Sequence, residues 1–128
     1  MTANANYIEY YNCGDIEADW TVAIPVGCFG NISGYNQLAL ESTSTPFLKI
    51  KEVTKINQSD NYLIFDSKTE LIYGSTGTSL STATGSIYNQ FIVGGHFVKI
   101  PVGTGAMYFT LTSWPSGTTY LMYDYLYY

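Results

Sequence analysis

The sequence predicts an all-β fold, specifically an antiparallel β-sandwich of two packed sheets with a jelly-roll or galectin-like arrangement. Short runs of β-branched and aromatic residues alternate with Gly, Asn, Ser and Pro, and no apolar stripe repeats every 3.6 residues. Thirteen tyrosines, six phenylalanines and two tryptophans stand beside only five lysines and no arginine. This composition is typical of strands and turns. About nine such runs in one domain require two layers.

Nine segments are expected as strands because each is bounded by turn-forming residues. They are Asn6 to Asn12, Trp20 to Val26, Gln37 to Ser42, Phe47 to Ile56, Tyr62 to Asp66, Glu70 to Tyr73, Phe91 to Ile100, Met107 to Ser113 and Thr119 to Tyr127. Residues 1–128 are expected to form a single domain, with residues 1–5 as a flexible N-terminal extension. A chain of this length can bury roughly two-thirds of its unfolded surface in one core.

The segment from Phe47 to Ile56 alternates most clearly. Leu48 and Ile50 are expected to face the core, with the neighbouring lysines in water. Burying both Val53 and Ile56 as well requires a change of phase, which predicts a β-bulge or a bend near Glu52.

A hairpin is expected in NYLIFDSKTELIYG, because the polar turn formers Ser67 to Thr69 separate two runs of strand formers. Asp66, at the end of the first strand, can accept hydrogen bonds from backbone N–H groups of its own turn. The run from Ser75 to Ser86 is small, polar and Gly-rich, and it is expected to be an exposed, mobile loop. Gly94-Gly95 and Gly103-Thr104-Gly105 are expected at tight turns with positive φ.

Charge and hydropathy exclude two classes of partner. The net charge is −5 and arginine is absent, so the chain lacks the positive charge that phosphate contacts require. Nucleic-acid binding is therefore not expected. No apolar run approaches the roughly 20 residues of a spanning helix, and the first residues lack a basic, apolar leader. We expect a soluble, unprocessed chain without membrane insertion and without a cofactor.

Three segments carry a family resemblance in their order and spacing: YYNCGDIEADW from Tyr10 to Trp20, NYLIFDSKTELIYG from Asn61 to Gly74, and HFVKIPVGTGAMYFTL from His96 to Leu111. They resemble the C-terminal β-sandwich domain of siphophage distal tail (Dit) proteins. NCGDIEA is similar to the family's N-x-G-x-x-x-A stretch, LIFDS to its l-x-I-D-T/S core, and FVKIPVGTGAM to its F-x-L-P-P-G-x-N-x-I segment. The chain departs from the family at Val102 and Gly105, where proline and asparagine are common, and in its tyrosine-rich C-terminus.

The resemblance implies a virion structural protein of the phage tail or baseplate, without catalysis, assembled in the host cytoplasm. Its implied partners are other virion proteins, further copies of the same chain, and a host-surface glycan. A complete distal tail protein also has an N-terminal half that builds a hexameric ring. The chain is thus expected to be an excised or standalone C-terminal domain, or part of another virion protein with the same sandwich.

The alternative function is a carbohydrate-binding module of the β-sandwich type. Trp114 lies in an expected loop and offers an aromatic platform, with Tyr35, Asn36 and Asn89 as polar partners. Trp20, at the start of a strand, is expected in the core.

Catalytic and metal sites are weakly indicated. His96 with Asp66, Glu70 or Asp15 could form a triad with a serine, but no nucleophile-elbow motif accompanies them, and an enzyme is not expected. The carboxylates of Glu17 and Asp19 are expected to cap a turn or meet solvent, with a glycosidase pair as the alternative. Calcium at Asp60, Asn61 and Asp66 is a further alternative, but the spacing matches no established loop and no metal is expected.

The two cysteines, Cys13 and Cys28, are expected as buried thiols. The alternatives are one disulfide or, less readily without a CxxC pair, metal ligation.

The C-terminal segment YLMYDYLYY is apolar on both faces of the expected strand. Such a strand is either covered on both sides within the domain, or lies at an edge that another subunit covers. Because tyrosine is enriched at interfaces, a subunit contact is the functional hypothesis. Its residues are Tyr123, Tyr125, Tyr127 and Tyr128.

Overall fold

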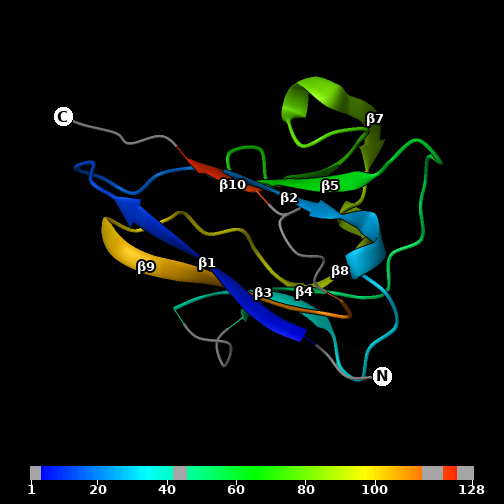
Figure 1. Ribbon diagram of the computed structural model, residues 1–128, viewed down its shortest axis with the longest axis horizontal. Helices are drawn as coiled ribbons and strands as arrows, with labels where there is room; N and C mark the ends of the chain where they lie inside the picture. The colour runs from blue at the N-terminus through cyan, green and yellow to red at the C-terminus, as the bar shows by residue number, and fades with distance from the viewer. Residues whose placement is uncertain (1–3, 42–45, 114–119, 124–128) are drawn as a thin grey trace.

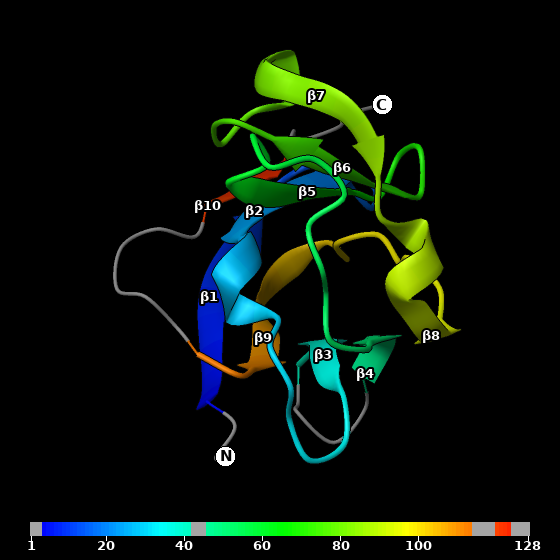
Figure 2. The same ribbon diagram turned by 90° about the vertical axis from the view of Figure 1, so that its right-hand side faces the viewer.

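The protein is an antiparallel β-sandwich, as the sequence predicts. The computed structural model describes residues 4–41, 46–113 and 120–123, with the side chains of residues 7–41 and 46–113. These residues contain ten strands in two five-stranded sheets, and every pairing of strands is antiparallel. Figure 1 shows the two sheets as separate layers, and Figure 2 shows the first sheet running beneath the second. The finer jelly-roll assignment stays a prediction.

The first sheet has the order β1-β9-β3-β4-β8. Its strands are β1 (Asn4–Asn12), β9 (Gly103–Leu111), β3 (Asn36–Leu40), β4 (Pro46–Ile50) and β8 (Ile92–Gly95). β1 and β9 pair over nine residues without a bulge. The long strand β1 therefore forms one edge of the sheet, and the short strand β8 forms the other.

The second sheet has the order β10-β2-β5-β6-β7. Its strands are β10 (Tyr120–Tyr123), β2 (Trp20–Pro25), β5 (Tyr62–Asp66), β6 (Leu71–Ser75) and β7 (Ala83–Ile87). Single turns of 3₁₀ helix lie at Val26–Cys28 (η1), Leu80–Thr82 (η2) and Asn89–Phe91 (η3). The described residues contain no helix long and apolar enough to cross a membrane.

The core lies between the two sheets and combines side chains from both. Its largest fully buried members are Trp20, Phe29, Phe65, Tyr88 and Phe109. The rings of Phe29 and Phe65 stack with centroids 5.8 Å apart. Trp20 is only 1% exposed, which confirms its predicted place in the core.

The predicted hairpin is confirmed, with β5 at its expected bounds. Asp66 pairs with Leu71 across it. The Asp66 carboxylate accepts a hydrogen bond from the backbone N–H of Lys68 (3.1 Å) and another from the Thr69 hydroxyl (2.9 Å). The turn is therefore held by the aspartate at the strand end, as the sequence predicts.

The strand predicted from Phe47 to Ile56 is too long, because β4 ends at Ile50. Leu48 and Ile50 are fully buried as predicted, and Val53 packs against the core, but Ile56 is 49% exposed. The pairing with β8 shifts at Lys49 and Ile50, so the irregularity lies earlier than the predicted bend. After Ile50 the chain leaves the sheet and does not continue as a strand through the predicted bend.

The segment from Ser75 to Ser86 is not a loop throughout, because it contains η2 and β7. β7 pairs with β6 at the edge of the second sheet, and its side chains are exposed or half-buried. A strand that buries no apolar face has no hydrophobic alternation in its sequence, which explains the error.

The strand predicted from Phe91 to Ile100 is also shorter, since β8 ends at Gly95. Gly95 has φ +87° and Gly103 has φ +104°, so both occupy the conformation predicted for them. The prediction of positive φ is wrong for Gly94, within β8, and for Gly105, within β9. At the N-terminus, β1 begins at Asn4, inside the expected extension of residues 1–5.

Candidate functional site

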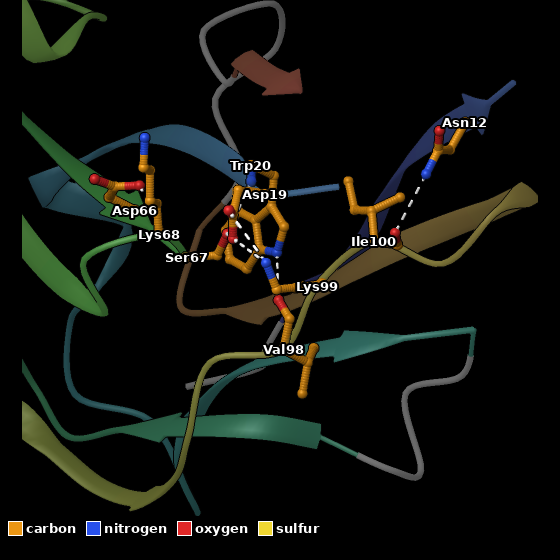
Figure 3. Close-up of polar contacts among 9 residues, drawn as sticks. All are labelled: Asn12, Asp19, Trp20, Asp66, Ser67, Lys68, Val98, Lys99 and Ile100. Carbon is orange, nitrogen blue, oxygen red and sulfur yellow. Dashed lines mark hydrogen bonds and ion pairs between the residues drawn. The ribbon is translucent and has the colours of Figure 1, made fainter. Parts of the chain in front are cut away.

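The three segments that carry the family resemblance meet at one junction. The first segment supplies Asn12, Asp19 and Trp20, the second supplies Ser67, and the third supplies the stretch from Val98 to Ile100. Figure 3 shows these side chains and carbonyl groups directed toward one another from β1, β2 and the connections after β5 and β8. Residues about 80 positions apart along the chain are thereby joined, as the Lys99–Asp19 contact shows.

Trp20 is the central residue of this junction. Its backbone N–H donates to the Ser67 hydroxyl (2.8 Å), and its carbonyl accepts from the Ser67 N–H (3.0 Å). The indole N–H donates to the carbonyl of Val98 (2.6 Å). A buried tryptophan requires a partner for its N–H, and the third segment provides it.

Asn12 fixes the first segment to the third. Its side chain is fully buried; its oxygen accepts from the Gly14 N–H (3.0 Å), and its amide donates to the carbonyls of Ile16 (3.1 Å) and Ile100 (3.4 Å). Ala18 and Ile100 also exchange backbone hydrogen bonds of 2.9 Å. The asparagine of the NCGDIEA segment therefore shapes the turn that leads into β2.

Asp19 connects the junction to solvent. Its carboxylate accepts from the Ser67 hydroxyl (3.1 Å) and forms an ion pair with Lys99 (3.2 Å). Because the two charged side chains are 31% and 50% exposed, the pair contributes at most about 1 kcal/mol. Ala18, which lies between Glu17 and Asp19 in the chain, bridges to Ile100.

Two of the predicted sugar ligands have structural roles. Asn36 is fully buried; its amide donates to the Gly30 carbonyl (3.2 Å), and its oxygen accepts from the Thr112 N–H (3.1 Å). Asn89 accepts from the Ile72 N–H (2.8 Å) and donates to the Glu70 carbonyl (2.9 Å), which joins η3 to β6. Tyr35 is 45% exposed, and Trp114 lies outside the described residues. A sugar-binding role for Tyr35 and Trp114 stays a prediction.

The predicted interface tyrosines are only partly described. The backbone of Tyr123 ends β10, where it pairs with Trp20, whereas Tyr125, Tyr127 and Tyr128 lie outside the described residues. β10 is an edge strand. This is the position in which cover by another subunit was expected.

Cys13 and Cys28 do not form a disulfide, so the disulfide alternative is wrong. Cys28 is buried as predicted, and burial raises the pKa of its thiol above the ordinary value. Cys13 is exposed, contrary to the prediction of two buried thiols. Its turn bends around the Asn12 side chain and leaves Cys13 at the surface.

His96 is exposed and follows β8, with its backbone N–H bound to the Phe47 carbonyl (2.9 Å). Asp66, considered above as a triad partner of His96, accepts hydrogen bonds within its own turn at the end of β5. In the described part of the chain, no three His, Cys, Asp or Glu side chains gather where they could hold a metal ion. Asp60 is buried instead, and it accepts hydrogen bonds from the hydroxyls of Thr84 and Tyr88.

A second region is hollowed at the surface, and the sequence predictions did not point to it. A hollow of about 420 Å³ opens where β1 and β9 lie side by side. Tyr7 and Tyr108 are register partners on the sheet face opposite the core, and their ring centroids are 5.5 Å apart. Glu9 follows on the same face of β1, opposite Ala106. The alternation of Tyr7, Glu9 and Tyr11 in the first strand was the available signal.

Glu41 forms another wall of the hollow. It has φ +68°, which is uncommon for a residue with a side chain. Its carboxylate accepts a hydrogen bond from the hydroxyl of Tyr10, a residue 3% exposed. A Cβ at Gly105 would overlap both groups, so the glycine provides the space in which they meet.

Comparisons with protein-family models, with curated proteins and with solved structures found no match. Two features of the chain itself bear on its function: the junction of the three segments, and the tyrosine-lined hollow on the first sheet.

Proposed function

We propose that the chain is a structural β-sandwich domain of a phage virion, resembling the C-terminal domain of a distal tail or baseplate protein. Its proposed work is assembly with other virion proteins and contact with the host surface, without catalysis. The proposed partners are neighbouring tail proteins, further copies of the same chain and a host-surface glycan. Assembly would take place in the host cytoplasm.

The observation that carries this proposal is the junction of the three segments. Each segment alone is short and weakly specific, but Trp20 of the first segment bonds Ser67 of the second and Val98 of the third, and Asn12 of the first bonds Ile100 of the third. Because the three segments hold one another in place, we take their similarity to the family as one shared structural pattern and not as three chance similarities. The side chains at the junction bind backbone groups and one another, which is the role expected of residues that specify a fold.

The sheet edges support a role in assembly. Among the strands that the structure describes, β1, β8, β10 and β7 form the four sheet edges. Edge strands present backbone groups that another chain can pair with, and natural proteins usually protect them. β1 has nine residues, and its Tyr11 is 59% exposed. A long, regular edge with an exposed aromatic ring is suited to cover by a neighbouring subunit.

The proposal is tested by quantifying the protein in purified virus particles from its source. Co-sedimentation with intact particles through a density gradient, in a fixed ratio to the major tail protein, is the expected result. A protein that stays in the unassembled fraction while tails are complete would contradict the proposal.

The carbohydrate-binding module stays the alternative. Its predicted platform at Trp114 lies outside the described residues, and Asn36 and Asn89 are engaged with the backbone. The observation that favours glycan binding is instead the hollow on the first sheet.

A further inference from the structure

The hollow between β1 and β9 has the chemistry of a small-ligand site. It is open to solvent on one side, and its volume of about 420 Å³ is large enough for a small organic molecule. Tyr7 and Tyr108 supply apolar surface, whereas Glu9 and Thr104 supply hydrogen-bonding groups. A few polar groups beside aromatic walls is the usual composition of such sites.

The aromatic wall is a platform. The Tyr7 and Tyr108 rings are tilted by 40° with centroids 5.5 Å apart, so they pack against each other beside the hollow. Tyr7 is 55% exposed. Ring faces carry negative charge density and attract polarised C–H groups, and a pyranose ring presents such groups on one side.

The polar wall accepts hydrogen bonds. A carboxylate is an acceptor only, and its hydrogen bonds with hydroxyl donors are short and strong. Glu9 is exposed on the same face as Tyr7. None of the seven residues lining the hollow, all in the described part of the chain, is basic. Anionic ligands are therefore disfavoured, whereas a ligand with several hydroxyl groups is favoured.

The floor of the hollow is small and the position of Glu41 is fixed. Ala106 is the small residue on the face that Tyr7, Glu9 and Tyr108 share, whereas the Glu41 carboxylate meets the hydroxyl of buried Tyr10 on the core side of Gly105. A wall that is already ordered loses little conformational entropy when a ligand binds.

We propose that this hollow binds an uncharged mono- or disaccharide unit of a glycan, with the sugar ring stacked on Tyr7 and Tyr108 and its hydroxyls bonded to Glu9 and Thr104. This inference rests on the host-surface glycan of the proposed function, to which it gives a site and a ligand class, and it uses none of the four residues predicted as sugar ligands. A cationic ligand is the competing class, because Glu9 and Glu41 are both acidic. The sugar is favoured because the two rings form a platform rather than a cage, and Glu41 is already bonded to Tyr10.

The test is an NMR titration of the ¹⁵N-labelled chain. The neutral probes are the methyl glycosides of glucose, galactose, mannose and N-acetylglucosamine, with maltose, lactose and chitobiose; choline and lysine are the cationic probes. Each is added to about 20 mM, since isolated sugar sites of this size bind with Kd near 1 mM or weaker. At least one neutral probe is expected to shift the amides of β1 and β9 saturably.

Variants locate the site and identify its class. Tyr7→Ala is expected to reduce affinity more than tenfold, whereas Tyr35→Ala, which removes an exposed tyrosine outside the hollow, is expected to leave it unchanged. Glu9→Gln keeps an acceptor and is expected to weaken sugar binding less than tenfold. Raising the salt from about 20 mM to about 500 mM should not alter the affinity for an uncharged sugar.

Three results would overturn the proposal. The first is the absence of saturable shifts with every neutral probe, in a chain whose spectrum shows that it is folded. The second is sugar binding that Tyr35→Ala removes and Tyr7→Ala leaves intact. The third is binding of choline or lysine alone, lost in Glu9→Gln and at high salt, which would assign the hollow to a cation.

Discussion

At the scale of single residues, the fold depends on polar side chains that serve the backbone. Ser67 is the clearest example, because its hydroxyl bonds both the Trp20 N–H and the Asp19 carboxylate. The pattern LIFDS suggested the turn aspartate from the sequence, and Asp66 indeed holds its turn. The partners of Ser67 could not be predicted, since they lie 47 and 48 residues away along the chain.

Ser67→Ala is expected to lower the free energy of unfolding by about 1–3 kcal/mol, because it leaves the buried N–H of Trp20 without its partner. Urea denaturation followed by tryptophan fluorescence measures the loss. Ser33→Ala, at an exposed position before β3, is the matched control and should change stability by less than about 0.5 kcal/mol. Equal free energies of unfolding for the two variants would show that the Ser67 hydroxyl at the junction does not stabilise the fold.

Tyr88 predicts a pH dependence of stability. Burial, and secondly the hydrogen bond to Asp60, raise the pKa of Tyr88 above its ordinary value of 10.0. The folded chain therefore holds this proton more tightly than the unfolded chain does. The contribution is fully present below pH about 10 and is lost as the pH rises from there toward the folded-state pKa.

Denaturation at a series of pH values from about 8 to about 11 measures this loss. Tyr88→Phe should flatten the fall in the free energy of unfolding above pH about 10, whereas Tyr35→Phe, at a 45% exposed tyrosine, should keep it. If the free energy of unfolding of Tyr88→Phe falls above pH about 10 as steeply as that of the unchanged chain, groups other than Tyr88 cause the loss of stability at alkaline pH.

At the scale of elements, hydrophobic alternation predicted the strands that bury one face. β5 has its expected bounds, and β2 and β3 lie within two residues of theirs. β7 was missed because Ala83, Thr84 and Ser86 give no apolar period, and hydrogen bonds such as that from Thr84 to Asp60 hold it instead. β8 ends at Gly95, where the positive φ turns the chain out of the sheet.

Gly95→Ala is expected to destabilise the protein by more than about 2 kcal/mol, for two separate reasons. Its backbone has φ +87°, and an added Cβ would overlap the carbonyl of Phe47 on β4. Gly27→Ala is the matched control, because a Cβ at Gly27 meets nothing within 4 Å. The urea midpoints of the two variants should differ clearly; coincident midpoints would refute this account of the β4–β8 edge.

At the scale of the whole molecule, the two sheets unite segments from across the chain. β1 pairs with β9, so Tyr7 meets Tyr108 and Glu9 meets Ala106. The composition predicted two layers, but it contained no information on which strands are neighbours. The hollow depends on that register and on the position of Glu41 after β3. Neither can be read from the sequence, so the sequence predicted other residues, such as Asn36 and Asn89, as sugar ligands.

The proposed virion role belongs to this scale, because it concerns where the folded domain is displayed. The junction of Asn12, Trp20 and Ser67 stabilises the sandwich, while β1 and β10 leave two edges for neighbours. Virion structural domains are repeated by the symmetry of the particle, so each copy should occupy an equivalent position.

Immunogold electron microscopy of intact particles tests this claim most directly. An antibody raised against the chain is applied to purified particles from the source, with particles preincubated with free chain as the competition control. The account predicts label at one fixed position on the tail, at its tip or baseplate, which free chain abolishes. Intact, tailed particles that carry no label and no protein detectable after denaturation would contradict it.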